Sequence, residues 1–425
     1  MMDAGCHRLR RAASASWIQD VDMTDSEPAS PDEPATRDEV RTWLARRWRG
    51  TNRRAFLAEA ADAGWVVPTW PEDFYGRGLS EAAGRVVREE FGRVGAPQFL
   101  GGNVIAFNVI RAFGATEELR TTVIRGFLTG EFEVCLLYSE PGAGSDLAAV
   151  QTRAERDGDE WVVNGQKVWT TGGRTATHGL LVARTDWDVP KHQGLSFFVL
   201  PMQADGIEVR PIRQITGEAE FNEVFLTDAR VPDVYRLGEP TEGWRVLQTA
   251  LAVERMLMGG GVGGRARSQG SDAGAPGAGG GADLVTLARQ RSRNTDPVAR
   301  QELARLLTLQ RIGRWNAQRA ANAADQRLAS LLKLAMSEVL HGSARLQGHL
   351  LGAEAMLYGD ASPAADGANR AAMYAFVNSI GGGSDQIQRN IIGERILGLP
   401  KEPQVDRDVP FREVRKADAR RDFGA

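Results

Sequence analysis

The sequence predicts an α+β fold in which a helical N-terminal domain, a middle β domain and a helical C-terminal domain follow one another. Three observations predict it. Apolar residues recur at helical spacing from residue 36 to about 130, short β-branched and aromatic runs fill residues 134–235, and helical spacing returns after residue 243. Because helices and strands come in separate blocks instead of alternating, the order argues against a Rossmann-type fold.

The composition is that of a globular protein of two to three domains. Of its 425 residues, 42% are hydrophobic, which is enough for a sizeable core. The 52 basic and 55 acidic residues give a net charge of −3, so no overall basic field favours nucleic acid. Two cysteines and five scattered histidines predict neither a disulfide framework nor a metal site, and this cysteine usage is typical of a cytoplasmic protein. No stretch reaches the ~18 apolar residues that a membrane span needs.

The N-terminal helical domain is expected at residues 36–133. Residues 1–35 are expected to form a disordered extension, because residues 24–36 are acidic, rich in proline and without large apolar side chains. The spacing of Thr36 and Glu39 predicts a capping box at the start of the first helix. Further helices are predicted at 52–64, 79–94 and 117–130.

The middle β domain is expected at residues 134–243. Residues 161–169 predict a β-hairpin, because β-branched and aromatic residues flank Asn164-Gly165, a pair favoured in type I′ turns. Further short strands are predicted at 180–183, 195–200, 207–210 and 221–226. Short strands at short intervals are typical of a small barrel or sandwich.

The C-terminal helical domain is expected at residues 244–412, followed by a tail at 413–425. Helices are predicted after Gly243, from Asp296-Pro297, at 331–351 and at 384–397. Residues 259–281 stand apart, because 11 of these 23 residues are glycine. That composition predicts a flexible surface loop and not a phosphate-binding loop.

The first candidate site is the loop Tyr138-Ser-Glu-Pro-Gly-Ala-Gly-Ser-Asp146. Its proline and glycines force an irregular backbone with exposed N–H groups, and Ser139 and Ser145 add hydroxyls. Such a loop can hold a phosphate or a polar planar ligand. The alternative is a sharp turn between the helical block and the β block.

Two later segments offer contacts for a ring and for phosphates. Trp169, followed by two threonines, presents a flat aromatic surface on which a ring system can stack, although a core tryptophan is the alternative. Gly381–Gly383 precede a predicted helix, whose first N–H groups can hold phosphates. The alternative there is an ordinary loop capped by Ser384.

A candidate general base lies in the apolar helical run Leu-Ala-Val-Glu-Arg-Met-Leu. Burial of its carboxylate, Glu254, would raise the pKa of this group and suit it to proton abstraction. The alternative is a carboxylate that is exposed or paired with a neighbouring arginine.

The joint occurrence of these segments, in this order, resembles the acyl-CoA dehydrogenase family. The run from Tyr138 to Gly173 is similar to the signature T/S-E-P-x-x-G-S-D followed by N-G-x-K-x-W-x-T, and FNEVFLTDARVP and NIIGERILGLP look like later blocks. The resemblance covers residues 36–402. It implies an N-terminal α-helical domain, a middle β-barrel and a C-terminal α-helical bundle.

The resemblance also implies the chemistry of an oxidoreductase that acts on a CH–CH group. Family members hold FAD and oxidise an acyl-CoA thioester across its α and β carbons. A carboxylate removes the α proton while the β hydrogen passes as hydride to flavin N5. Side chains supply the base and the hydrogen bonds to the thioester oxygen, whereas the hydride acceptor is the cofactor.

Matching positions carry the family's site residues over to this chain. The resemblance assigns contacts with FAD to Leu136, Tyr138, Ser139, Gly144, Ser145, Trp169, Thr171, Ser384 and Gln386. It assigns contacts with the substrate to Ser145 and Arg255.

The position of the base departs from the commonest pattern. Many members have a Glu directly before the Gly-Thr of the C-terminal motif, and here that position is Gly382. Other members, such as isovaleryl-CoA dehydrogenase, use the Glu of a Glu-Arg pair on an earlier helix, which Glu254-Arg255 resembles. We therefore expect Glu254 to be the base, while the N–H of Gly382 can still donate to the thioester oxygen.

Two further departures bear on the partners. The usual Arg-x-Phe-Gly segment is not visible near Leu287–Pro297, and Leu350–Glu354 stands where Gly-Gly-x-Gly is usual. These departures resemble bacterial members that form mixed α₂β₂ assemblies and often act on bulky, sterol-derived acyl-CoA esters. The expected partners are an acyl-CoA, an electron-transfer flavoprotein or similar acceptor, and either a second copy, in a homodimer or homotetramer, or a related subunit. The alternatives are a non-catalytic partner subunit and an acyl-CoA oxidase.

Overall fold

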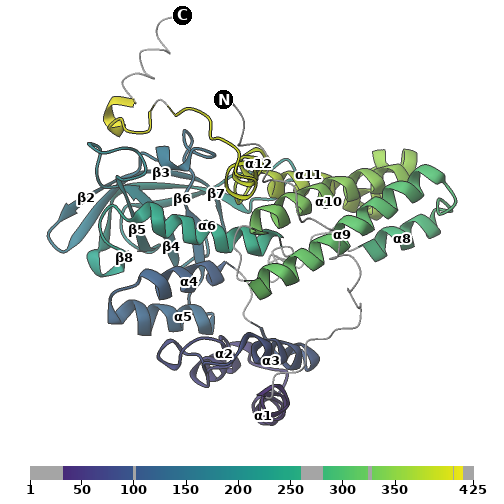
Figure 1. Cartoon of the computed structure of the whole chain (residues 1–425), viewed down its shortest axis with the longest axis horizontal. Coiled ribbons are helices and arrows are strands. Elements are labelled where there is room, and N and C mark those ends of the chain that lie inside the picture. The colour runs from purple at the N-terminus through teal and green to yellow at the C-terminus, as the bar shows by residue number, and fades with distance from the viewer. Residues whose placement is uncertain (1–31, 99–101, 260–280, 324–327, 405, 415–425) are drawn as a thin grey trace, which may run out of the picture.

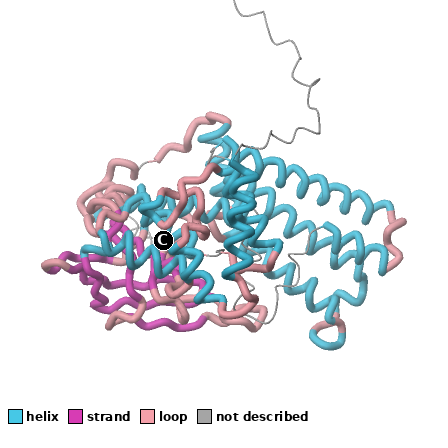
Figure 2. The backbone as a smooth tube through the Cα atoms, turned by 90° about the horizontal axis from the view of Figure 1, so that it is seen from below, coloured by secondary structure: helices cyan, strands magenta, loops and turns pink. Residues whose placement is uncertain are grey.

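The predicted order of helices, strands and helices is confirmed. The structure is a computed structural model that describes residues 32–98, 102–259, 281–323, 328–404 and 406–414. The N-terminal helices lie at one end, the strands form a sheet beside them, and long C-terminal helices extend away on the other side (Figure 1). Seen from below, the strands gather in one half of the molecule and the long helices fill the other (Figure 2).

The N-terminal helices begin earlier than expected and include one that was not predicted. They are α1 (Asp32–Arg47), α2 (Arg53–Asp62), α3 (Glu81–Arg93), α4 (Asn103–Phe113), a π-helical turn (Leu119–Val123) and α5 (Ile124–Thr129). Residues 32–35 are helical and not disordered, because Asp32, Glu33 and Pro34 are all favoured in a first helical turn. The predicted extension at residues 1–31 lies outside the described residues.

Capping side chains explain where several of these helices start. The Asn52 side chain accepts a hydrogen bond from the Ala55 N–H at 3.2 Å, and Ser80 does the same for Ala83 at 3.2 Å. Such caps satisfy an N–H group that has no partner inside the helix. The predicted helix at 52–64 therefore starts where the sequence indicated.

The middle domain holds an open sheet and not the closed barrel that was expected. Its strands are β1 (Val134–Leu137), β2 (Arg153–Asp157), β3 (Glu160–Thr171), β4 (His178–Arg184), β5 (Leu195–Pro201), β6 (Ile207–Pro211), β7 (Phe221–Pro232) and β8 (Arg236–Leu237). They pair in the order β6-β7-β3-β2-β4-β5-β8, and β1 pairs in parallel with β4. Among the described strands β6 and β8 do not pair with each other, and β8 has only two residues, so the sheet stays open at these ends.

The predicted hairpin at Asn164-Gly165 is wrong. Both residues lie inside the continuous strand β3, where the Asn164 side chain exchanges hydrogen bonds of 2.9 Å with Asp228 on β7. Gly165 is required by space, because a Cβ there would lie 2.7 Å from the Cα of Thr152. The hairpin turn is instead at Gly158, between β2 and β3, where φ is +62°.

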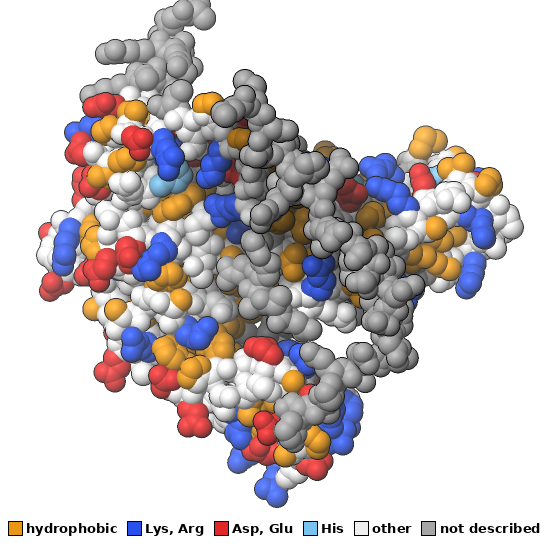
Figure 3. Space-filling model, in the orientation of Figure 1, with side chains coloured by type: hydrophobic (Ala, Val, Ile, Leu, Met, Phe, Trp, Pro, Cys, Tyr) orange, Lys and Arg blue, Asp and Glu red, His pale blue; other side chains and the backbone are white. Residues whose placement is uncertain are grey.

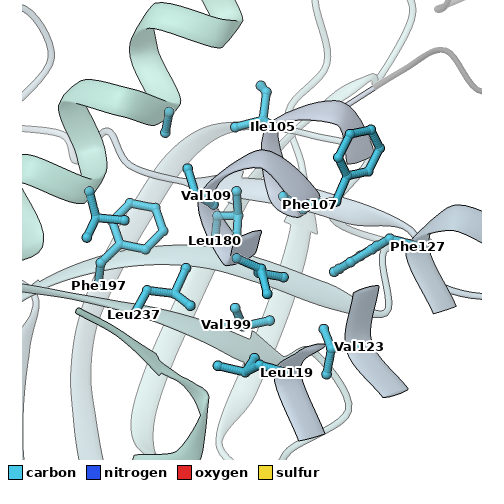
Figure 4. Close-up of a cluster of buried hydrophobic side chains, with 14 of the residues drawn as sticks. Ile105, Phe107, Val109, Leu119, Val123, Phe127, Leu180, Phe197, Val199 and Leu237 are labelled. Carbon is cyan, nitrogen blue, oxygen red and sulfur yellow. The ribbon is translucent and has the colours of Figure 1, made fainter. Parts of the chain in front are cut away.

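The largest core lies where the sheet meets the helices of the N-terminal domain. Figure 4 shows Ile105 and Val109 of α4 above Leu180, Phe197 and Val199 of the sheet. All five side chains are at most 3% exposed. The N-terminal domain and the sheet therefore share one apolar interior, and α6 contributes to the same cluster.

The C-terminal helices agree with the predicted starts and add two helices. They are α6 (Gly243–Gly259), α8 (Gly281–Gln290), α9 (Pro297–Ala323), α10 (Leu328–Leu351), α11 (Pro363–Ile380) and α12 (Asp385–Ile391), which continues into a π-helical turn (Ile392–Ile396). Helices α8 and α11 were not predicted. The helix expected from Asp296 is confirmed, since its side chain accepts from the Val298 N–H at 2.9 Å. Most of the glycine-rich loop 259–281 and of the tail 413–425 lies outside the described residues.

Helix α10 is central to the C-terminal bundle. It packs against α6, α9, α11 and α12, so it connects the helix that carries Glu254 with the segment that follows the Gly381–Gly383 loop. None of the helices within the described residues is long and apolar enough to cross a membrane. On the face shown in Figure 3, acidic and basic side chains are interspersed and form no single-sign field.

Candidate active site

The loop at residues 138–146 is held in shape by a buried ion pair. Glu140 and Ala143 exchange two backbone hydrogen bonds, of 3.0 and 3.1 Å, which close a tight turn. The Lys167 ammonium, whose side chain is 0% exposed, donates to Glu140 Oε1 at 2.8 Å and to the Tyr138 carbonyl at 3.0 Å. Lys167 therefore fixes both the turn and the residue that precedes it.

The buried carboxylate of this pair is fully engaged. Glu140 also accepts from the backbone N–H groups of Gln151 at 2.6 Å and Thr152 at 2.8 Å. Burial disfavours the charged form, but the charge of Lys167 and these hydrogen bonds outweigh it and hold the pKa of Glu140 below its ordinary value. Sequence reasoning missed Glu140 and Lys167 as functional residues, although both stand inside the signature block.

The ion pair leaves the tip of the loop open to a ligand. Gly142, Gly144 and Ser145 are exposed, and a Cβ on either glycine would meet no atom within 4 Å. At its base the loop is tied to β3, because Val168 donates its N–H to the Ser139 carbonyl at 2.9 Å. The backbone N–H groups of the tip are thus presented on a rigid support, which suits a polar or phosphate-bearing ligand.

Trp169 lies next to this loop in a strained conformation. Its φ is +63°, a value that residues other than glycine rarely adopt, and β3 loses register with β7 between Lys167 and Thr170. The indole is 60% exposed, so the alternative of a core tryptophan is wrong. Thr171 is exposed on the same face while Thr170 between them is buried. Strain that exposes a large aromatic ring is typical of a functional site.

The Gly381–Gly383 loop is supported by a residue that the sequence did not single out. Gln388, which is 0% exposed, donates its side-chain N–H to the carbonyls of Gly382 at 3.0 Å and Gly383 at 3.3 Å. Ser384 caps α12, since its hydroxyl accepts from the Ile387 N–H at 3.4 Å. Gln386 is exposed. The structure thus assigns Ser384 a capping contact and leaves the Gln386 side chain at the surface.

Glu254 lies one helical turn from a residue that packs on this glycine loop. Met258, at i+4 on α6, points to the same face as Glu254. A Cβ on Gly382 would lie 2.6 Å from the Met258 sulfur, and the φ of Gly382 is +64°. A side chain at position 382 is therefore disfavoured by both space and backbone. The contact shown with Gly382 is that of Met258, one helical turn after Glu254 on α6.

The charge of Glu254 also acts on Tyr138, at the start of the loop of the middle domain. The negative charge of Glu254, together with burial as the larger cause, holds the pKa of Tyr138 well above its ordinary value. Tyr138 is 6% exposed, and among the described residues its hydroxyl has no hydrogen-bond partner. Arg255 is half-buried, and burial lowers its pKa although the Glu254 charge opposes this. The fold therefore brings together Glu254, Arg255 and the loop at 138–146.

A second contact between domains joins α11 to the loop that precedes β7. Arg370 and Tyr374 of α11 donate to Glu218, in the loop before β7, at 3.1 and 2.6 Å. Two residues further on, the Glu220 carbonyl accepts from the Gly172 N–H at 3.2 Å, directly after β3. Helix α11, which leads to the Gly381–Gly383 loop, is thus bonded to the segment that pairs with the end of β3.

The two segments that depart from the family pattern contact each other. Arg291, after α8, donates to Glu354 at 3.0 Å, and Glu354 also accepts from the Ser362 hydroxyl at 2.7 Å. These contacts engage the arginine within this protein chain. Within the described residues no group of three or more His, Cys, Asp or Glu side chains could hold a metal ion.

Comparison with known proteins shows to which family this chain belongs. The family models for the N-terminal, middle and C-terminal domains of acyl-CoA dehydrogenase match residues 31–131, 135–229 and 241–397. Acyl-CoA dehydrogenase IpdE1 of Mycobacterium tuberculosis is 36% identical over 392 residues, which is 86% of this chain and 97% of that protein. This chain belongs to the acyl-CoA dehydrogenase family. It is accordingly an oxidoreductase.

Other members of the family extend the comparison. Acyl-CoA dehydrogenase FadE34 of Mycobacterium tuberculosis is 35% identical over 353 residues, or 80% of this chain and 45% of that protein. The solved Tcur3481-Tcur3483 steroid ACAD is 28% identical with a TM-score of 0.67, covering 88% of this chain and 99% of that chain. The ChsE4-ChsE5 complex from Mycobacterium tuberculosis is 26% identical with a TM-score of 0.62, covering 89% of this chain and 100% of that chain.

Acyl-CoA dehydrogenases are flavoproteins, and the residues present fit a flavin nucleotide. Trp169 offers an exposed ring for stacking and Thr171 an exposed hydroxyl beside it, while the space over Gly142 and Gly144 is open. Leu136, for which the sequence predicts a contact with FAD, is half-buried and packs at the edge of the large core.

Proposed function

We propose that this protein is an FAD-dependent acyl-CoA dehydrogenase in which Glu254 removes the α proton of the thioester. The observation that carries the proposal is the convergence of Glu254, the loop at 138–146 and Gly382. Met258 contacts Gly382 from the same face of α6, and the Glu254 charge acts on Tyr138.

The residues that would hold FAD are those of two loops and one strand end. The backbone N–H groups of Gly142, Gly144 and Ser145 at the tip of the loop and the hydroxyl of Thr171 would bind polar edges, and Trp169 would pack on the ring. The backbone N–H groups around Ser384 would face the nucleotide. FAD, when bound, supplies the hydride-accepting chemistry that no side chain offers.

The chain's own groups bind the thioester and move its proton. Glu254 accepts the α proton, and its half-buried position keeps bulk water from competing for that proton. The N–H of Gly382 donates to the thioester oxygen, where negative charge develops. The Nε of Arg255 is buried and has no hydrogen-bond partner among the described residues, and we propose that a substrate acceptor near Glu254 supplies that partner.

We further propose that the acyl group is bulky and that a related subunit completes the assembly. Two observations support this: one similar structure is a steroid ACAD, and another is the complex of two proteins, ChsE4 and ChsE5. Phe376 and Ile380, one turn apart on α11, are 60% and 67% exposed and suit a contact between subunits. Because Arg291 is bonded to Glu354 within this chain, we propose that the partner subunit supplies part of the nucleotide site. The electron acceptor is an electron-transfer flavoprotein or similar protein.

The test is an anaerobic screen of flavin bleaching with purified protein, alone and with a homologous subunit encoded nearby. The panel compares steroid-derived acyl-CoA esters with linear ones. Bleaching by a bulky ester, lost by about 100-fold in Glu254→Gln, supports the proposal. The matched control is Glu338→Gln, an exposed carboxylate on α10 that pairs with Arg305. Unchanged bleaching in Glu254→Gln would overturn the assignment of the base.

The same screen separates the two alternatives. A protein that bleaches with no ester, even beside its partner, is a non-catalytic subunit. Rapid peroxide production after oxygen is admitted identifies an acyl-CoA oxidase.

A further inference from the structure

The ammonium of Lys333 is fully buried in the C-terminal helical bundle. Lys333 of α10 is 0% exposed, and its Nζ donates to Asp385 Oδ1 at 3.0 Å. Ser337, one turn later, donates to the same oxygen at 2.8 Å, and Asn378 of α11 donates to the Ser337 hydroxyl at 2.9 Å. Removing an ammonium from water is expensive unless it is paired, so the position of Lys333 requires an explanation.

The position of Lys333 connects the two halves of the site. Asp385 is the first residue of α12 and follows the Gly381–Gly383 loop and Ser384. Helix α10 packs on both α12 and α6, and Lys333 lies close enough to Glu254 for their charges to interact. One cation thus bonds to the carboxylate that starts α12 and interacts electrostatically with the carboxylate proposed as the base.

We propose that Lys333 is a positioning residue that anchors the glycine loop through Asp385 and, by its positive charge, keeps Glu254 in the carboxylate form. The role of Lys333 toward Glu254 rests on the proposed function of Glu254 as the base. Burial lowers the pKa of Lys333, whereas its hydrogen bond to Asp385 and the charges of Asp385 and Glu254 oppose that shift. The two carboxylates therefore stabilise the ammonium, and by reciprocity the ammonium stabilises them.

Other charged groups in the described part of the chain also lie around α6 and α10, and each differs from Lys333. Arg255 is adjacent in sequence and also interacts with Arg395, and Tyr138 stays neutral because its pKa is raised. Arg389 of α12 acts on Lys333 with the same sign of charge. Helix α4, which also packs on α6, has only one charged residue, Arg111, and its guanidinium lies over Trp70. Lys333 is the buried cation that pairs with Asp385 and faces Glu254.

The test measures flavin reduction as a function of pH in Lys333→Met, with Lys333→Gln as a second variant should the first fail to fold. Loss of the charge makes Glu254 harder to ionise, so the acid limb of the profile moves to higher pH by about one unit. At pH values below the midpoint of this limb, the rate of flavin reduction in Lys333→Met is then about tenfold lower than in the wild type. Lys333→Arg keeps the charge and restores the limb.

The matched control is Ser337→Ala, which removes a hydrogen bond to the same Asp385 oxygen but no charge. It is expected to lower the melting temperature without moving the acid limb. A second measurement uses the flavin-free protein. The melting temperature of Lys333→Met approaches the wild-type value as the pH falls from 8 to 5, because protonation relieves the carboxylates that have lost their cation.

Two results separate the failure of this proposal from failure of the proposed base. If Glu254→Gln abolishes reduction and the acid limb is the same in wild type, Lys333→Met and Lys333→Gln, Lys333 has no electrostatic role and the present proposal is wrong. If Glu254→Gln reduces flavin at the wild-type rate, the base has been misassigned and the proposed function fails first.

Discussion

The substitution Lys167→Met probes the buried ion pair that shapes the loop at 138–146. It removes an ammonium that is 0% exposed and donates to Glu140 at 2.8 Å and to the Tyr138 carbonyl at 3.0 Å. The carboxylate of Glu140 is left with the N–H groups of Gln151 and Thr152. Breaking one side of a buried pair costs about 3–5 kcal/mol, because a charge remains without compensation. At about 2–4 °C per kcal/mol, the melting temperature falls by about 6–20 °C.

The assay is thermal unfolding followed by circular dichroism, with flavin content measured on the same samples. The control is Arg230→Met, which removes the exposed ion pairs of a 52% exposed side chain with Asp157 and Glu160 on the same sheet. Exposed pairs of this kind contribute at most about 1 kcal/mol. The double variant Lys167→Met/Glu140→Gln is expected to recover part of the loss, because no charge is then buried.

The pH dependence has a definite sign. In the wild type the pKa of Glu140 lies below its ordinary value of 4.5, so the pair stabilises the fold above that pH and the contribution is lost as the pH falls. Without Lys167, burial raises the pKa of the Glu140 carboxyl, and protonation relieves the variant. The difference in melting temperature between wild type and Lys167→Met should therefore shrink from pH 8 to pH 5. A variant that melts within about 2 °C of wild type at pH 8, with normal flavin content, would refute the reasoning.

Three further predictions concern backbone geometry. Gly165→Ala is expected to destabilise the protein by at least about 2 kcal/mol in denaturant unfolding, because its Cβ would lie 2.7 Å from the backbone of Thr152. Trp169→Gly should leave the melting temperature unchanged or higher, since it relieves a φ of +63° at a 60% exposed residue, while flavin retention in dialysis falls at least tenfold. Gly382→Ala should lower the free energy of unfolding by about 1–2 kcal/mol because of its φ of +64°. Adding Met258→Ala removes the steric contact but leaves this backbone cost. A double variant as stable as the wild type would contradict the assignment of a backbone cost.

Local patterns predicted the elements whose ends are set by nearby residues. Asn52, Asp296 and Ser384 cap helices where the sequence placed the starts, because a cap needs only a side chain and an N–H group two or three residues away. Asn164-Gly165 failed for the opposite reason. A glycine required by the approach of Thr152, a residue of another segment, has the same local pattern as a turn glycine.

The site could be predicted only in part. The loop at 138–146, Trp169 and Glu254 could be proposed from the sequence because each belongs to a contiguous motif, and the exposure of the loop tip and of Trp169 agrees with that prediction. Gln388 was missed because its bonds to the carbonyls of Gly382 and Gly383 depend on how the loop folds back on α12, while the predicted contact of Gln386 with FAD stays a prediction. The contacts of Lys333 join residues that are 52 positions apart, and pairings of that range are set by how the helices pack.

The identity of the base can be measured without any hydride transfer. In an acyl-CoA analogue with sulfur in place of the β carbon, no β hydrogen can leave, so exchange of the α hydrogen with D₂O reports the base alone. Mass spectrometry would follow this exchange in wild type, Glu254→Gln and Glu338→Gln of equal flavin content. We expect Glu338→Gln to match the wild type and Glu254→Gln to exchange about 100-fold more slowly. Exchange at the wild-type rate in Glu254→Gln would contradict the account.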